Sequence, residues 1–217
     1  IHHIQAVMRG CKSALVVGDM PFMSYNTSIR EAIANAGRLM KEGGCDVVKL
    51  EGGATFAPTV EAIVKAGIPV QGHIGLTPQT ASALGGFKMQ GKDASAAKQI
   101  IDDARALEAA GAFSIILEAV PAPLGQLVAQ SVKVPVIGIG AGPDVDGQVL
   151  VTHDMVGLFD KFVPKFVKQY TQIRPIILDA LREYRKEVLE VKFPGPEHSF
   201  KMPAETLKQL KKMAKSS

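Results

Sequence analysis

The sequence lacks the features of membrane and secreted proteins. No apolar run approaches the roughly 20 residues that a membrane-spanning helix needs. The first residues, Ile1 to Gln5, have neither the basic nor the apolar region of a secretion signal. The two cysteines, Cys11 and Cys45, form no CxxC pair and no disulfide framework. We therefore expect a protein of a reducing, cytoplasmic compartment without a membrane partner.

An excess of positive charge is also lacking in most of the chain. The net charge of +4 arises in residues 201–217, where Glu205 is outnumbered by five lysines: Lys201, Lys208, Lys211, Lys212 and Lys215. The first 200 residues carry 20 basic and 20 acidic side chains, which disfavours a nucleic-acid-binding body. This asymmetry predicts a main domain over residues 1–200 and a basic C-terminal tail over residues 201–217.

Short apolar runs alternate with helical patterns, which is typical of an α/β protein with a parallel sheet. The runs are nearly continuous, as in strands buried on both faces, and occupy residues 14–17, 47–50, 68–70, 114–117 and 134–137. Helices are predicted after a capping box at Ser28 and Glu31, after Thr77-Pro78, over residues 94–110 and over about 164–190. Residues 148–151 fit either a sixth strand or a helix.

Polar side chains follow successive predicted strands where each one ends. They are Asp19, Lys49 with Glu51, His73, Glu118 and the glycine-rich segment 138–142. A (β/α)8 barrel gathers residues from many strands at one rim, whereas a doubly wound sheet concentrates its site at one switch point. The pattern favours the barrel. Because such a barrel takes about 250 residues, the chain length and its start at Ile1 predict that about the first two βα units are lacking.

Each of these polar residues has a structural explanation when taken alone. Asp19 fits a turn, Lys49 and Glu51 fit an ion pair, and His73 fits a buried, hydrogen-bonded histidine. Together, however, Asp19, Glu51 and Glu118 would place three carboxylates at one rim, which requires a compensating cation or proton. Oxygen ligands favour Mg²⁺, and a metal, a lysine and a spare carboxylate are suited to proton abstraction beside a carbonyl group.

Other catalytic motifs are absent or incomplete. The segment Gly138–Gly142 follows a strand, but Pro143 stands where a dinucleotide-binding fingerprint needs its third glycine. We expect this segment to allow a close backbone approach instead. No Walker loop, GxSxG elbow or HExxH motif occurs. Met20, Phe22 and Met23 are expected to be packing residues.

Six blocks of sequence resemble the ketopantoate hydroxymethyltransferase family. In chain order they are Gly18–Tyr25, Val48–Gly53, Gly72–Gln79, Leu117–Pro121, Ile137–Gly142 and Phe193–His198. The resemblance extends from about residue 1 to Phe200, and the last seventeen residues, 201–217, lie outside it. An amino-terminal portion of the family, with its first two strands and an Asp-Ser pair, has no counterpart in these residues.

The resemblance implies a TIM barrel of the phosphoenolpyruvate/pyruvate type and a defined reaction. A one-carbon unit passes from 5,10-methylenetetrahydrofolate to α-ketoisovalerate through a Mg²⁺-stabilised enolate, giving ketopantoate for pantothenate and coenzyme A synthesis. Asp19 would bind Mg²⁺ and the keto acid, Lys49 the substrate, and Glu51 the metal. Glu118 would be the catalytic base, with His73 in a supporting role. The family also implies a large ring-like homo-oligomer, a decamer.

Three alternatives remain open at this point. One is a Mg²⁺-dependent C–C lyase of the same superfamily that acts on 2-oxo acids without folate. Another is a non-catalytic fragment that only assembles with itself or a partner. Nucleic-acid binding through the tail ranks last, because five lysines at a chain end give weak, salt-sensitive attraction.

Overall fold

The structure, a computed structural model, describes residues 1–83 and 85–215. These residues form two compact units. The first contains residues 1–151 and 164–167, and the second contains residues 152–163 and the chain from Lys168 onward. All the strands and all the candidate site residues belong to the first unit.

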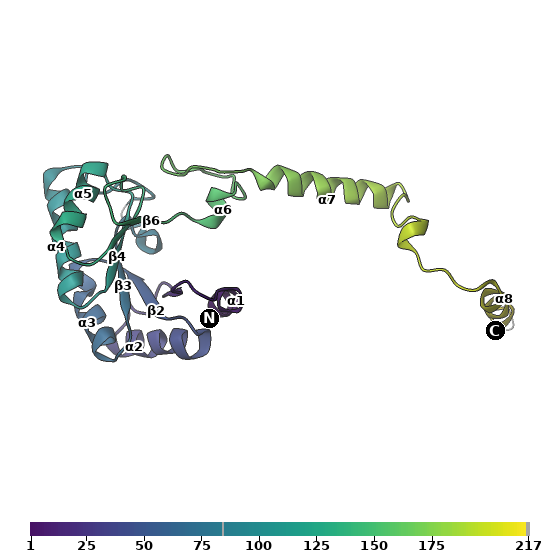
Figure 1. Cartoon of the computed structure of the whole chain (residues 1–217), viewed down its shortest axis with the longest axis horizontal. Coiled ribbons are helices and arrows are strands. Elements are labelled where there is room, and N and C mark those ends of the chain that lie inside the picture. The colour runs from purple at the N-terminus through teal and green to yellow at the C-terminus, as the bar shows by residue number, and fades with distance from the viewer. Residues whose placement is uncertain (84, 216–217) are drawn as a thin grey trace. The chain divides into compact units, whose positions relative to one another are not determined.

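The first unit is built on a six-stranded parallel sheet (Figure 1). Its strands are β1 (Val17–Asp19), β2 (Val47–Glu51), β3 (Val70–Gly75), β4 (Ser114–Glu118), β5 (Val136–Ile139) and β6 (Gly147–Gln148). Each strand pairs with the next one in the sequence, so the order has no switch point of the kind found in doubly wound sheets. Strands β1 and β6 are the edges, and the described residues do not close the sheet into a barrel.

The predicted strands are present, with bounds shifted by two or more residues at three of them, since the run 134–137 overlaps β5 only at Val136 and Ile137. The runs 14–17 and 68–70 touch β1 and β3 only at their last residues, Val17 and Val70. The ambiguous segment 148–151 supplies Gln148 to β6, and the rest of it is neither strand nor helix. No helix separates β5 from β6. Instead the Asp146 carboxylate accepts a hydrogen bond from the Val136 N–H at 2.8 Å and ties the connection to the sheet.

Four helices cover one face of the sheet (Figure 1). They are α2 (Ile29–Arg38), α3 (Ala57–Lys65), α4 (Ala94–Ala109) and α5 (Ala122–Ser131). The apolar core lies between these helices and side chains such as Val48, Leu50 and Ile115, all fully buried. A Cβ atom added at Gly72 would lie 2.7 Å from Leu107 of α4, which shows how closely this helix packs. The alternate strand residues, including Lys49 and His73, therefore point to the other face.

Local signals explain where these helices begin and end. The Ser28 hydroxyl accepts a hydrogen bond from the Glu31 N–H at 3.2 Å, as predicted. The Glu31 carboxylate bonds to Thr27 rather than closing the predicted capping box. After α2 the chain continues through a π-helical turn, η1 (Leu39–Gly43), and stops at Gly44 in the left-handed region. Helix α1 (His2–Gly10) packs against η1 through Ile4.

Two short 3₁₀ helices, η2 (Ala54–Phe56) and η3 (Pro78–Thr80), follow β2 and β3. Pro78 begins η3, but the Thr77 hydroxyl makes no capping bond to the backbone and contacts the Thr80 hydroxyl instead. The helix predicted after Thr77-Pro78 is thus a single turn. It places Gln79 beside the end of β2, where it contacts Glu51.

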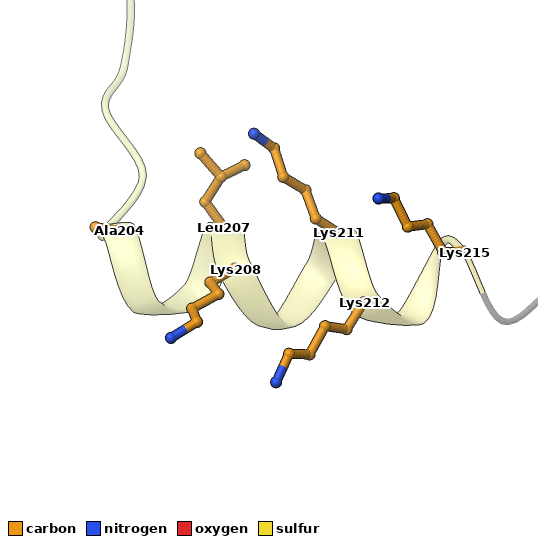
Figure 2. Close-up of a pocket in the computed structure, with 6 residues that line it drawn as sticks. All are labelled: Ala204, Leu207, Lys208, Lys211, Lys212 and Lys215. Atoms are coloured by element: carbon orange, nitrogen blue, oxygen red, sulfur yellow. The ribbon is translucent and has the colours of Figure 1, made fainter.

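The second unit contains α6 (Thr152–Met155), α7 (Ile173–Leu189), η4 (Pro196–His198) and α8 (Ala204–Met213). The helix predicted over 164–190 begins only at Ile173. A helix starting at 164 would hold Pro175 in its interior, whereas here Pro175 lies in the first turn, where its missing N–H costs nothing. Figure 2 shows lysine side chains projecting from α8 and from the turn after it. The residues that line a surface pocket here are Ala204, Leu207, Lys208, Lys211, Lys212 and Lys215. No helix among the described residues has the length and apolarity to cross a membrane.

Candidate active site

The structure brings all five predicted site residues together at the carboxyl ends of neighbouring strands. We call Asp19, Lys49, Glu51, His73 and Glu118 the rim cluster. The register places Asp19 opposite Lys49, Glu51 opposite His73, and Gly75 opposite Glu118. Because the strands are parallel and in register, their polar side chains leave the sheet on the face away from the helices.

The Lys49 ammonium group lies at the centre of one half of the cluster. Its Nζ atom is 2.8 Å from Asp19 Oδ1, 3.6 Å from Glu51 Oε1 and 3.2 Å from His73 Nδ1. The Glu51 side chain is only 4% exposed, so the positive charge of Lys49 compensates a carboxylate that water scarcely reaches. Asp19, at 55% exposure, faces solvent.

His73 connects Lys49 to Glu118. An ammonium group can only donate, so the contact with Lys49 makes His73 Nδ1 the acceptor and assigns the ring proton to Nε2. That Nε2 atom lies 3.2 Å from Glu118 Oε2, but its alignment is not that of a hydrogen bond. Among the described residues it is the one buried side-chain polar atom without a hydrogen-bond partner. His73 thus keeps a free N–H donor beside Glu118.

Two residues that the sequence did not single out, Tyr25 and Gln79, complete the surroundings of Glu51. The Gln79 N–H donates to Glu51 Oε2 at 3.0 Å, and the Tyr25 hydroxyl accepts from the Glu51 N–H at 3.3 Å. Burial raises the pKa of the Tyr25 phenol to about 12, with the nearby Glu51 and Asp19 charges acting in the same direction. The phenol therefore stays protonated and donates to Gln79 Oε1 at 3.0 Å. Neither residue is charged, and the rim cluster was predicted from charged residues and a histidine at strand ends.

Close backbone contacts hold the end of β4 in place. Gly75 has φ +87°, and a Cβ atom there would lie 2.3 Å from the Glu118 carbonyl oxygen. Ala119, directly after Glu118, has φ +50°, a conformation that costs a non-glycine residue free energy. Hydrogen bonds from the Ala119 N–H to Ile139 and from the Gln90 N–H to the Ala119 carbonyl enforce this geometry. The backbone around Glu118 is thus fixed by its neighbours.

The glycine-rich segment after β5 makes the predicted close approach. Gly140 and Gly142 both have positive φ. A Cβ atom on Gly142 would lie 2.4 Å from Ala122 Cβ at the start of α5, and one on Gly140 would overlap the ring of Phe166. These glycines therefore allow the backbone after β5 to pack closely against the start of α5 and against Phe166.

The donor set suits a hard cation that completes its coordination with water and substrate. Among the described residues no three His, Cys, Asp or Glu side chains converge on a ready-made metal site. Asp19 and Glu51 offer two carboxylates on either side of Lys49. Mg²⁺ characteristically binds through one or two carboxylates and retains several waters. The residues present therefore fit Mg²⁺ and do not fit a cation that needs an all-protein cage.

Comparison with known proteins gives a consistent picture. The family model described as ketopantoate hydroxymethyltransferase matches residues 1–196. A relative from Heliobacterium modesticaldum named 3-methyl-2-oxobutanoate hydroxymethyltransferase is 60% identical over 94% of this chain and 74% of its own length. One of the same name from Syntrophobacter fumaroxidans is 58% identical over 97% of this chain and 74% of its own length.

Solved structures give a weaker match. A δ-aminolevulinic acid dehydratase from Toxoplasma gondii aligns at 13% identity with a TM-score of 0.44, over 85% of this chain and 65% of that one.

Proposed function

The chain belongs to the ketopantoate hydroxymethyltransferase family, and from this premise we propose that it transfers a hydroxymethyl group from 5,10-methylenetetrahydrofolate to α-ketoisovalerate (3-methyl-2-oxobutanoate), giving ketopantoate for pantothenate synthesis. The observation that carries the proposal is the rim cluster, in which a partly buried lysine, 14% exposed, lies beside a carboxylate–histidine pair. Members of the family are transferases.

We propose that Asp19 and Glu51 hold Mg²⁺, because they supply the two carboxylates that this ion prefers. When bound, the ion polarises the 2-oxo group of the keto acid and makes its C3 proton more acidic. Asp19 also contacts the substrate, which is consistent with its exposure to solvent. Glu51 would supply its carboxylate to the ion from a buried position.

Lys49 binds the keto acid, and Glu118 removes its proton. Lys49 is the cationic side chain of the rim cluster, so it attracts the substrate carboxylate or oxo group. Glu118 ends β4 and keeps a carboxylate oxygen 3.2 Å from His73 Nε2. As general base it takes the C3 proton. The His73 N–H lies beside this carboxylate without an aligned hydrogen bond, so we assign His73 a supporting electrostatic role toward the base.

Water cleaves the methylene bridge of the folate. Its oxygen stays on the one-carbon unit, which is then at the oxidation level of formaldehyde, and the two folate nitrogens end as N–H groups in tetrahydrofolate. The C3 carbanion adds to this carbon, which forms the new C–C bond, and the resulting alkoxide takes up a proton to become the hydroxyl group. The chain's own contribution is to hold the keto acid and accept its proton.

We further propose that the sheet is part of a (β/α)8 barrel of the phosphoenolpyruvate/pyruvate type and that the enzyme is a homo-oligomer. Sequential strand order, helices on one face and polar side chains on the other support the barrel. Exposed apolar side chains on α7, among them Ile176, Leu181 and Tyr184, support a contact with another copy.

The proposal is tested by proton exchange at C3 of α-ketoisovalerate. With Mg²⁺ and no folate, the wild-type protein is expected to exchange C3-bound deuterium with solvent hydrogen. Glu118→Gln keeps the shape of the side chain but not its basicity, so exchange should fall by about 10²–10⁴-fold. Equal exchange in wild type and Glu118→Gln would show that Glu118 is not the base. A folate-independent cleavage of the 2-oxo acid would instead identify a C–C lyase.

A further inference from the structure

Tyr25 and Gln79, two uncharged residues, form a small hydrogen-bond network around Glu51. We propose that they are positioning residues that fix the Glu51 carboxylate, so that one of its oxygens is presented to the metal and the other is held by the protein. The inference rests on the proposed function, since it assigns these residues a role in holding Mg²⁺.

Gln79 is anchored at three points. Its backbone N–H donates to Glu51 Oε2 at 3.0 Å, and its side-chain Oε1 accepts from the Tyr25 hydroxyl at 3.0 Å. Its Nε2 group donates to the Met20 carbonyl oxygen at 2.9 Å. These bonds join the loop after β1, which carries Met20 and Tyr25, to the turn η3 after β3. Glu51, at the end of β2, is held between them.

Tyr25 contacts the backbone of Glu51 rather than its carboxylate. Its hydroxyl accepts from the Glu51 N–H at 3.3 Å while donating to Gln79. The backbone of Glu51 is thus tied to Tyr25, and its carboxylate to Gln79. With the two tethers joined by one hydrogen bond, the Glu51 side chain has little freedom to rotate.

This arrangement distinguishes the two carboxylate oxygens of Glu51. Oε2 accepts the Gln79 N–H, whereas Oε1 is turned toward Lys49 Nζ at 3.6 Å and His73 Nδ1 at 3.7 Å, both beyond hydrogen-bond distance. A carboxylate that is already fixed through one oxygen can bind a cation through its other oxygen without a further loss of side-chain conformational entropy on binding. Groups that hold a metal ligand in this way commonly change metal affinity or activity 10–100-fold when they are removed.

The ring and the hydroxyl of Tyr25 have separable roles. The ring is fully buried and packs edge-on against Phe56, with 5.4 Å between ring centroids. Tyr25→Phe keeps this packing and removes only the hydroxyl. Its effect on the metal therefore reports on the hydrogen-bond network rather than on the core.

The experiment measures the dissociation constant of Mg²⁺ by titration calorimetry for wild type, Tyr25→Phe, Gln79→Leu and the double variant, well below each unfolding midpoint. Both single variants are expected to bind Mg²⁺ about 10–100-fold more weakly. Because the Tyr25 hydroxyl and the Gln79 side chain share one hydrogen bond, the loss of binding free energy in the double variant should be smaller than the sum of the two single losses. Tyr170→Phe is the matched control, since the Tyr170 side chain is 67% exposed and Lys168 Nζ lies over its ring.

The outcomes separate this inference from the proposed function. Mg²⁺ affinity in Tyr25→Phe and Gln79→Leu equal to that of wild type would overturn the positioning role while leaving the metal site intact. Weakened binding in both variants supports the role, even if the C3 exchange test fails and the proposed reaction is wrong. A wild-type protein that binds no Mg²⁺ would overturn both the metal site and the role of Tyr25 and Gln79 toward it.

Discussion

Replacing Lys49 with methionine would remove the positive charge at the centre of the rim cluster while keeping most of the side-chain volume. The attraction between Lys49 Nζ and Glu51 Oε1 across 3.6 Å is about 5 kcal/mol in a medium of effective dielectric constant near 20. Desolvation of the lysine offsets part of this. The contact with Asp19 adds at most about 1 kcal/mol, because that carboxylate is half exposed.

We expect Lys49→Met to lower the free energy of unfolding by about 3 kcal/mol at neutral pH, since Glu51 would become an uncompensated buried charge. For a chain of this size such a loss lowers the unfolding midpoint by roughly 6–12 °C. Differential scanning calorimetry without added Mg²⁺ measures it directly.

Lys65→Met is the matched control for this prediction. Lys65 pairs with Glu61 at 2.6 Å, but the two side chains are 72% and 53% exposed, so the loss should stay below about 0.5 kcal/mol. If Lys49→Met and Lys65→Met unfold at the same temperature, Lys49 does not compensate Glu51 and the electrostatic account of the cluster is wrong.

Two further predictions concern the same part of the fold. Gly75→Ala should lower the free energy of unfolding, measured with denaturant, by about 3 kcal/mol or more, because its Cβ atom would overlap the Glu118 carbonyl. Gly67 has a similar φ of +85° but open space around it, so Gly67→Ala should lower the free energy of unfolding by only about 1 kcal/mol. Equal losses in the two variants would refute the close-approach argument. The pKa of the Tyr25 phenol is about 12 in the folded protein and 10 in the unfolded chain. Between these values the native state still holds the proton that the unfolded chain has lost. The free energy of unfolding should therefore fall between about pH 10 and 12, by up to roughly 3 kcal/mol. Tyr25→Phe should lack that component in pH-dependent unfolding and Tyr170→Phe should retain it; parallel curves for wild type and Tyr25→Phe would contradict the raised pKa.

The sequence predicted the strand order and the rim cluster because both depend on local pattern. Continuous apolar runs indicate buried parallel strands, and a charged residue at the end of such a run must lie at the rim of the sheet. For Asp19, Glu51 and Glu118 this was enough to place them on one edge. The pairing of Lys49 with Glu51 followed from their spacing of two on one strand.

Features that depend on contacts between distant segments could not be predicted from the local pattern of apolar and charged residues. Tyr25 and Gln79 are 54 positions apart, and neither has a charge or spacing that marks it, although both lie in the blocks that resemble the family. Met20 is fully buried as expected, but Phe22 and Met23 are 55% and 52% exposed, and their prediction as packing residues was wrong. They lie at the tip of a turn in which Met23 has φ +69° and its N–H is bound by Asn26, so their side chains point outward.

Transfer of the methylene carbon itself is the most direct test of the central claim. The wild-type protein is incubated with Mg²⁺, α-ketoisovalerate and 5,10-methylenetetrahydrofolate labelled with ¹³C in the methylene group. We expect ketopantoate carrying ¹³C in its hydroxymethyl carbon, formed together with unlabelled tetrahydrofolate. Unchanged α-ketoisovalerate, or products of its cleavage without incorporation of ¹³C, would contradict it.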